Sequence, residues 1–134
     1  MNLDWAKRWL EEGFQSGLDD VMDMYAEGVE FEDPIFGVRA RGKDELRQFF
    51  RGFFDRDAGV QTFQVKAYRG DTSAGAVEWV WRGEHTGELL GVSAAGKKTE
   101  TQGVSVFTFE DGLVTSQRDY WNAAAVLRQL GALR

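Results

Sequence analysis

The sequence has no cysteine, one proline and one histidine among its 134 residues. Without cysteine the chain can form no disulfide, no thiolate nucleophile and no cysteine-based metal site. A single histidine leaves carboxylates as almost the only remaining metal ligands. The glycines between residues 83 and 96 do not form the Gly-x-Gly-x-x-Gly turn that opens a helix in nucleotide-binding loops. We therefore expect neither a metal nor an organic cofactor.

Basic clusters and long apolar runs are also missing. The net charge is −6 and there is no run of lysine or arginine, so the chain repels phosphate backbones and anionic lipid headgroups. No apolar run approaches the ~20 residues of a membrane-spanning helix. The first nine residues mix acids and bases, unlike a signal peptide. We expect a cytoplasmic location, with no nucleic-acid or membrane partner.

Large hydrophobic side chains, by contrast, are plentiful. Hydrophobic residues make up 43% of the chain and aromatic residues 13%, including five tryptophans and ten phenylalanines. The length is close to the commonest domain size and suffices for one hydrophobic core. Neither an internal repeat nor a linker divides the chain. We expect a single domain over residues 1–134 whose core or pocket is built from rigid aromatic side chains.

Apolar residues at helical spacing predict four helices. The first covers residues 3–14, and a second follows Gly17, carries Tyr25 on its apolar face and ends at Gly28. The third covers residues 44–54, where phenylalanines recur three and four positions apart. The last begins after Asn122, which is a good N-cap.

Alternation with a period of two predicts the strands. They cover residues 29–33, 61–67 and 76–85 and a hairpin within residues 98–121, while residues 35–42 are predicted as loop. Strands joined by hairpins and segregated helices indicate an α+β fold with an antiparallel sheet. The strand at residues 76–85 is apolar on both faces, so we expect a second copy of the chain to cover its outer face in a homodimer.

The hairpin carries the most informative pattern. Its strands are joined by Glu-Asp-Gly, whose glycine is free to adopt the positive φ of a tight turn. Ser105 and Phe107 share one face of the first strand, and Gln117, Asp119 and Trp121 share one face of the second. If the two faces coincide, a carboxylate lies on an aromatic wall.

Several segments resemble one superfamily. Phe-Glu-Asp-Pro at residues 31–34 resembles the opening of ketosteroid isomerases. Gly-Glu-His-Thr-Gly-Glu-Leu-Leu-Gly at 83–91 and Phe-Thr-Phe-Glu-Asp-Gly at 107–112 resemble SnoaL-type polyketide cyclases, and Gln-Arg-Asp-Tyr-Trp at 117–121 resembles the last strand of limonene epoxide hydrolases. This similarity to the SnoaL-like and ketosteroid isomerase-like (nuclear transport factor 2-like) superfamily implies a curved sheet wrapped on three to four helices as a cone-shaped half-barrel.

The resemblance also implies roles for individual residues. It places Asp33 at the general base of ketosteroid isomerases and Asp119 at an acidic residue that performs acid chemistry. Trp9 stands where those isomerases have an oxyanion-stabilising tyrosine, and Ser105 where they have a protonated aspartate. An indole N–H and a hydroxyl can each donate one hydrogen bond, but they do not reproduce that oxyanion hole.

Each candidate also has a structural interpretation. Asp33 could accept backbone hydrogen bonds at the turn that follows it, and Asp119 could pair with Arg118 or Arg39 or be solvated. His85 could be a structural donor on a tryptophan-flanked strand. In the functional interpretation, unlike environments leave one aspartate ionised as a base and the other protonated as an acid, and His85 is a third acid or base near neutrality.

The sequence leads us to predict a cofactor-free general acid–base enzyme of the isomerase, aldol-type cyclase or epoxide hydrolase class. Its substrate is expected to be a small apolar carbonyl compound or epoxide, and its catalytic residues Asp33, Asp119 and His85. The substrate-binding residues are expected to be Trp9, Tyr25, Phe50, Phe54, Trp81, Ser105, Phe107 and Trp121. The alternative is a non-catalytic module of the same fold that binds a small hydrophobic ligand or serves dimer assembly.

Overall fold

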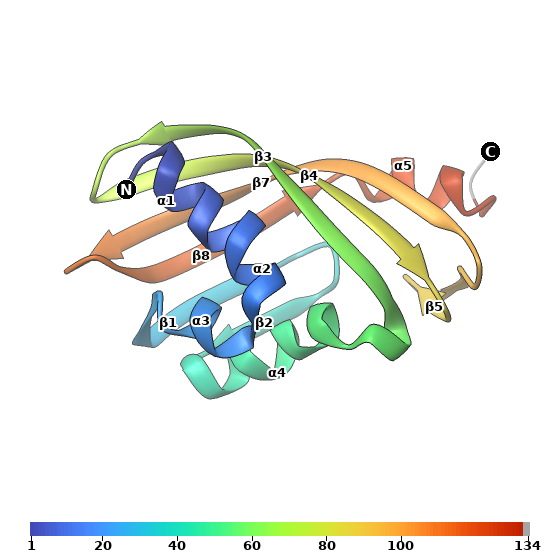
Figure 1. The fold of residues 1–134 in the computed structure, drawn as a ribbon, viewed down its shortest axis with the longest axis horizontal. Coiled ribbons are helices and arrows are strands. Elements are labelled where there is room, and N and C mark those ends of the chain that lie inside the picture. Colours follow the sequence, from blue (N-terminus) through green and yellow to red (C-terminus); the bar gives the residue numbers. More distant parts are fainter. Residues whose placement is uncertain (133–134) are drawn as a thin grey trace.

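The computed structural model describes residues 1–132, and the last two residues of the predicted 1–134 domain lie outside the described part. A curved six-stranded sheet forms its centre (Figure 1). The strands lie in the order β2 (Val38–Arg41), β1 (Tyr25–Asp33), β8 (Leu113–Trp121), β7 (Lys98–Glu110), β4 (Ala74–His85) and β3 (Gly59–Gly70). The α+β fold is confirmed. Neighbouring strands are antiparallel, as predicted, except β1 and β8, which pair in parallel.

The N-terminal and central helices lie on one face of the sheet, and the last helix lies beside β7 (Figure 1). A two-stranded ribbon, β5 (Glu88–Leu89) with β6 (Val92–Ser93), occupies the glycine-rich segment after β4. The helices are α1 (Leu3–Lys7), the π-helical turn η1 (Arg8–Glu12), α2 (Gly13–Ser16), α3 (Leu18–Met22), α4 (Lys43–Phe54), the 3-10 turn η2 (Arg56–Ala58) and α5 (Ala123–Gln129).

Two local predictions were wrong, both beside β1. Tyr25 belongs to this strand and not to a helix, since α3 ends at Met22 and Tyr25 pairs with Val114 of β8. Residues 38–41 form β2 and not a loop, because they pair with the second half of β1 across the turn that ends at Gly37. In both cases pairing with a distant or returning strand overrides the local pattern.

The hairpin prediction is confirmed. Ser105 lies opposite Asp119 and Phe107 opposite Gln117, so the two faces coincide. At the turn Asp111 and Gly112 both adopt positive φ, 53° and 79°, as in the primed turns whose twist matches paired strands. The pairing fixes the side chains of β7 and β8 that point toward the helices.

The predicted homodimer requires apolar side chains to be exposed on the outer face of the sheet. Val80 is one of the apolar residues on the second face of the strand predicted at residues 76–85, and it is only 4% exposed within the single chain. Val106 and Tyr120 are exposed on β7 and β8, at 44% and 41%. The homodimer stays a prediction. Across residues 1–132, no helix combines the length and apolarity that crossing a membrane requires.

Gly103 allows β4 and β7 to bring a tryptophan over the sheet. It pairs with Trp79 across the two strands, and an added Cβ would lie 2.4 Å from the Trp79 ring. We expect Gly103→Ala to displace this indole and to lower the free energy of unfolding by about 2 kcal/mol, measured by urea denaturation. Gly87→Ala is the control, because its Cβ would meet nothing within 4 Å. Equal stability of the two variants would contradict the expectation.

Candidate active site

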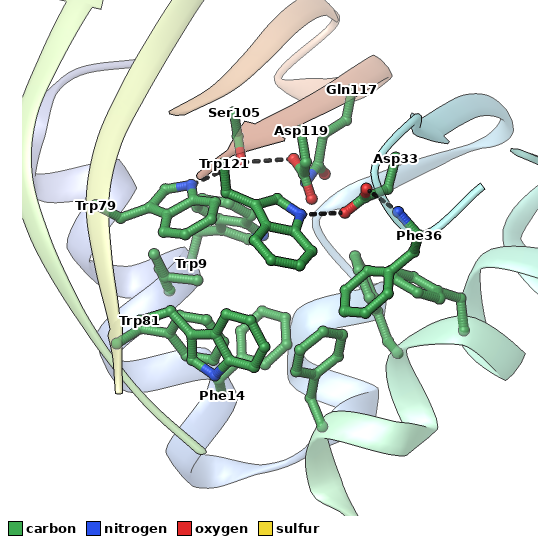
Figure 2. A pocket seen from close by; sticks show the side chains of 15 residues that line it. Trp9, Phe14, Asp33, Phe36, Trp79, Trp81, Ser105, Gln117, Asp119 and Trp121 are labelled. Atoms are coloured by element: carbon green, nitrogen blue, oxygen red, sulfur yellow. Dashed lines mark hydrogen bonds between the residues drawn. The ribbon is translucent and has the colours of Figure 1, made fainter. Parts of the chain in front are cut away.

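A pocket opens between the helices and the concave face of the sheet (Figure 2). It has a volume of about 440 Å³ including the solvent at its mouth, and its interior is narrow because aromatic side chains fill it. Its walls consist almost entirely of apolar side chains, with two carboxylates, one serine and one glutamine among them. The lining residues are Trp9, Leu10, Phe14, Asp33, Phe36, Phe49, Phe50, Phe53, Phe63, Trp79, Trp81, Ser105, Gln117, Asp119 and Trp121.

Asp119 projects from β8 into this pocket and is half-buried. Its Oδ1 atom accepts hydrogen bonds from the Ser105 hydroxyl at 2.6 Å and from the Gln117 amide at 2.9 Å. Loss of hydration raises the pKa of Asp119 to about 7; the two donors partly oppose this rise, and the nearby Asp33 charge adds to it. Asp119 therefore holds its proton close to neutral pH.

Asp33 ends β1 and is 2% exposed. Its Oδ1 atom accepts the backbone N–H groups of Ile35 and Phe36 at 3.0 and 2.9 Å, and its Oδ2 atom accepts the Trp121 indole N–H at 3.0 Å. Burial raises its pKa, against these three donors. Asp33 thus fulfils the predicted structural role at the turn and also faces the pocket with its second oxygen (Figure 2).

The two aspartates differ in the way that acid–base chemistry needs. Asp33 receives three hydrogen bonds and Asp119 two, and hydrogen bonds to a carboxylate favour its ionised form. The two groups are close enough for the charge of Asp33 to raise the pKa of Asp119. One site can therefore present an ionised and a protonated carboxyl group together.

The ion pair that was the structural alternative for Asp119 is absent from the described residues. Arg39 and Arg118 both bind Glu32 on the outside of the sheet, Arg39 at 2.6 Å. The pocket lining contains no lysine, arginine or histidine. Hydrogen-bond donors alone therefore stabilise the Asp119 carboxylate. Within residues 1–132 no cluster of three potential metal ligands occurs either.

His85 lies outside the pocket lining, at the end of β4. Its Nε2 atom is 2.8 Å from the Thr99 hydroxyl, and its ring packs edge-on against Trp81 with ring centres 6.2 Å apart. Burial lowers its pKa, so the neutral ring is favoured. These contacts fit the structural interpretation of His85.

Five of the eight predicted substrate-binding residues line the pocket: Trp9, Phe50, Trp81, Ser105 and Trp121. The indole N–H of Trp9, however, points away from it, since it donates to the hydroxyl of a tyrosine at 2.9 Å. Trp9 therefore contributes its ring to the wall and not an oxyanion donor.

The other three predicted residues lie behind the wall. Tyr25 is the tyrosine that accepts the indole N–H of Trp9, and Phe107 packs under that ring with centres 4.9 Å apart. Phe54 stacks on Phe14 with centres 5.2 Å apart and does not reach the lining. Helical and strand spacing placed all three on apolar faces, but did not distinguish the layer next to the pocket from the layer beneath it.

Sequence reasoning missed eight lining residues. Local spacing could have identified some of them. The phenylalanines of α4 form an apolar face, and Gln117 shares a strand face with Asp119. Phe36 had no such signal, because it lies in the turn after β1 and reaches the pocket only through tertiary folding. The missed residues are Leu10, Phe14, Phe36, Phe49, Phe53, Phe63, Trp79 and Gln117.

Comparisons with known proteins agree with this architecture. A family model described as SnoaL-like polyketide cyclase matches residues 5–130. A structure from Jannaschia sp. CCS1 described as a SnoaL-like polyketide cyclase has 22% identity and a TM-score of 0.80, covering 99% of this chain and 93% of its own. No curated protein matches the sequence.

Two further solved structures show the same fold. A protein with a ketosteroid isomerase-like fold from Catenulispora acidiphila, in complex with trimethylamine, has 18% identity and a TM-score of 0.73 over 97% of this chain and 90% of its own. An LEH-like epoxide hydrolase of M. tuberculosis has 16% identity and a TM-score of 0.73 over 96% and 87%.

The raised pKa of Asp119 predicts how stability depends on pH. The folded chain holds this proton up to about pH 7, whereas the unfolded chain releases it near 3.8, so stability falls as pH rises between these values. By pH 8 this effect should lower the free energy of unfolding of the wild type by about 4 kcal/mol relative to acid pH. Asp119→Asn cannot release this proton, so its free energy of unfolding should not show the decrease when both proteins are measured by urea denaturation from pH 4 to 8. Asp111→Asn, in the exposed turn, measures what any such exchange does. A stability difference between wild type and Asp119→Asn that is independent of pH would count against the raised pKa.

Proposed function

This chain belongs to the SnoaL-like polyketide cyclase family, and we propose that it is a general acid–base enzyme that needs no cofactor. Its substrate is a small, largely apolar carbonyl compound. The observation that carries the proposal is the pair of aspartates in one aromatic pocket, coupled electrostatically but held by different hydrogen bonds. General acid–base catalysis uses groups whose environments separate their pKa values in this way.

Asp33 is the base and Asp119 the acid. Asp33 has the larger number of donors, which stabilise its ionised form, and its Oδ2 atom accepts only the Trp121 indole, leaving a lone pair for the substrate. Asp119 has fewer donors and retains its proton to about pH 7. Both act in a site lined by apolar rings, where charges interact more strongly than in water.

The proposed reaction starts with enolisation. The Asp33 carboxylate removes a proton from the carbon next to the carbonyl group, the C–H electrons form the C=C bond, and Asp119 gives its proton to the carbonyl oxygen. The enol forms while Asp33 becomes neutral and Asp119 becomes charged, so the pair carries one negative charge throughout. In both possible second steps Asp119 takes back the enol O–H proton and the carbonyl C=O bond re-forms. If the enol is conjugated with a C=C bond, Asp33 returns its proton to the far carbon and an isomer results. If the enol carbon instead attacks a second carbonyl group, Asp33 gives its proton to the new alkoxide oxygen and an aldol ring is closed.

The pocket supports a carbonyl substrate better than an epoxide. Hydrolysis of an epoxide consumes a water molecule, which the protein must hold and activate. The polar side chains beside the aspartates already donate hydrogen bonds to them and are not free to hold a water molecule. Ser105 and Gln117 donate to Asp119, and Trp121 donates to Asp33. The remaining wall is aromatic and disfavours water. A narrow aromatic pocket suits a flat, apolar molecule, for which stacking supplies affinity.

Exchange of either aspartate tests this proposal. Apolar ketones and diketones that raise the melting temperature of the protein would be assayed for turnover or for exchange of their α-protons with D₂O. We expect Asp33→Asn and Asp119→Asn each to lower kcat at least about 100-fold.

Folding must stay intact for this test to be informative. In Asp33→Asn the amide oxygen can still accept the backbone N–H groups of Ile35 and Phe36, but its NH2 group then faces the Trp121 indole N–H, which loses its acceptor. We therefore expect a folded variant whose free energy of unfolding is lower by about 1–3 kcal/mol. A variant that does not fold would leave the turn as the role of Asp33. Ligands that stabilise the protein without turnover would identify the non-catalytic binding module instead.

A further inference from the structure

A buried chain of hydrogen bonds reaches Asp119 from the N-terminal helix. The indole of Trp9, on η1, donates to the Tyr25 hydroxyl on β1 at 2.9 Å. This hydroxyl lies 2.6 Å from Oε1 of Gln117 on β8, whose Nε2 atom lies 2.9 Å from Oδ1 of Asp119. Trp9, Tyr25 and Gln117 are each at most 2% exposed, so water does not compete for these bonds.

Only one direction of donation satisfies every group in this chain. An indole N–H can only donate, so the Tyr25 oxygen accepts from Trp9 and its own hydrogen must go to Gln117. The Gln117 oxygen is thereby occupied, and its amide N–H group faces Asp119. A reversed amide would leave the buried Tyr25 hydrogen without an acceptor, which is unfavourable in a site that water does not reach.

A second, shorter chain reaches the same oxygen from β4. The indole N–H of Trp79 donates to the Ser105 oxygen at 2.9 Å, and the Ser105 hydroxyl lies 2.6 Å from Oδ1 of Asp119 (Figure 2). The Ser105 oxygen accepts from the indole, and the acceptor of its own hydrogen among the described residues is Oδ1 of Asp119. Ser105 is 1% exposed. Each chain therefore starts at an N–H group that cannot accept a hydrogen bond.

We propose that these two tryptophan-anchored relays reserve Oδ1 of Asp119 as an acceptor and place its acidic proton on Oδ2. Two donors already point at Oδ1, so a hydrogen on that atom would meet other hydrogens. Oδ2 receives no donor from the described residues and is the oxygen left for the pocket. The inference rests on the proposed acid role of Asp119. The N–H groups of Trp9 and Trp79 and the hydroxyl of Tyr25 are positioning groups, which act on the substrate only through Asp119.

Tyr25 suits a relay that must not change its protonation state. Burial and the neighbouring Asp119 charge both raise its pKa well above the ordinary value of 10.0. It therefore stays neutral while Asp119 gives and regains its proton. The relay then holds the same direction of donation through the whole reaction cycle.

Tyr25→Phe tests the longer relay. Without the hydroxyl, the Gln117 oxygen loses its donor and the amide can turn over, so that its oxygen faces Asp119. The ionised carboxylate then loses a hydrogen bond, and we expect its pKa to rise by roughly one pH unit, measured by ¹³C NMR of the aspartate carboxyl carbons. We also expect kcat to fall about 10-fold with KM little changed, because the proton moves to Oδ1.

Two further variants keep the test decisive. Ser105→Ala removes the donor of the shorter relay and should raise the pKa of Asp119 in the same direction. Tyr68→Phe is the matched control, since the Tyr68 hydroxyl donates to the Asp71 carbonyl oxygen and neither residue lines the pocket. It should leave the titration of Asp119 unchanged.

An unchanged Asp119 pKa in either folded variant, Tyr25→Phe or Ser105→Ala, would overturn the proposal. The titration needs no substrate, so it decides the relays even if no turnover is found. Retention of full activity by Asp119→Asn, in contrast, would refute the acid role while leaving the relays to the NMR result.

Discussion

A carboxylate held in an aromatic pocket without a cation is the constraint on which this structure depends. Removal of Asp119 from water favours its protonated form, and no arginine or lysine among the lining residues reverses this effect. The protein stabilises the group with neutral donors from Ser105 and Gln117. Neutral donors moderate the rise in pKa without abolishing it. A salt bridge would instead have held Asp119 ionised, which is incompatible with the proposed acid role.

The tryptophans explain how an apolar pocket can also be a polar site. Three of the five, Trp9, Trp79 and Trp121, line the pocket with their rings while their N–H groups enter the hydrogen bonds around the aspartates. A fixed indole combines a large apolar surface with one donor of known direction. In the proposed site, donors of known direction let the pair of carboxyl groups carry a single charge in defined places. The proposal thus gives the side chains that exclude water a second role, which is to set the proton positions.

The sequence could predict the parts of the fold and site that repeat locally. The period of two in β7 and β8, with a turn between them, placed Ser105 and Asp119 side by side, and the phenylalanine spacing predicted α4 within one residue. The resemblance matched Asp33 and Asp119 to catalytic positions of related proteins, and the structure puts both in the pocket lining. The family and the α+β fold are likewise confirmed.

Features that depend on distant partners could not be predicted. Tyr25 has helical spacing to Val21 and Met22, but its pairing with β8 makes it part of a strand. The outcome matters for the site, because on a strand Tyr25 reaches both Trp9 and Gln117. The same limit applies to β2 and to Phe36, whose positions follow from the turn after Asp33. Local patterns identify apolar faces, but only the folded chain decides which residues meet across them.

Titration of the two aspartates in the wild-type protein decides whether one pocket contains an ionised and a protonated carboxyl group together. Carboxyl ¹³C chemical shifts, assigned with Asp33→Asn and Asp119→Asn, would be followed from pH 2 to 9. We expect Asp119 to titrate at about 7 and Asp33 at a lower pH, so that the pair carries one negative charge between the two midpoints. Two ordinary carboxyl titrations near ~4 would contradict it, because the pocket would then contain two bases and no acid.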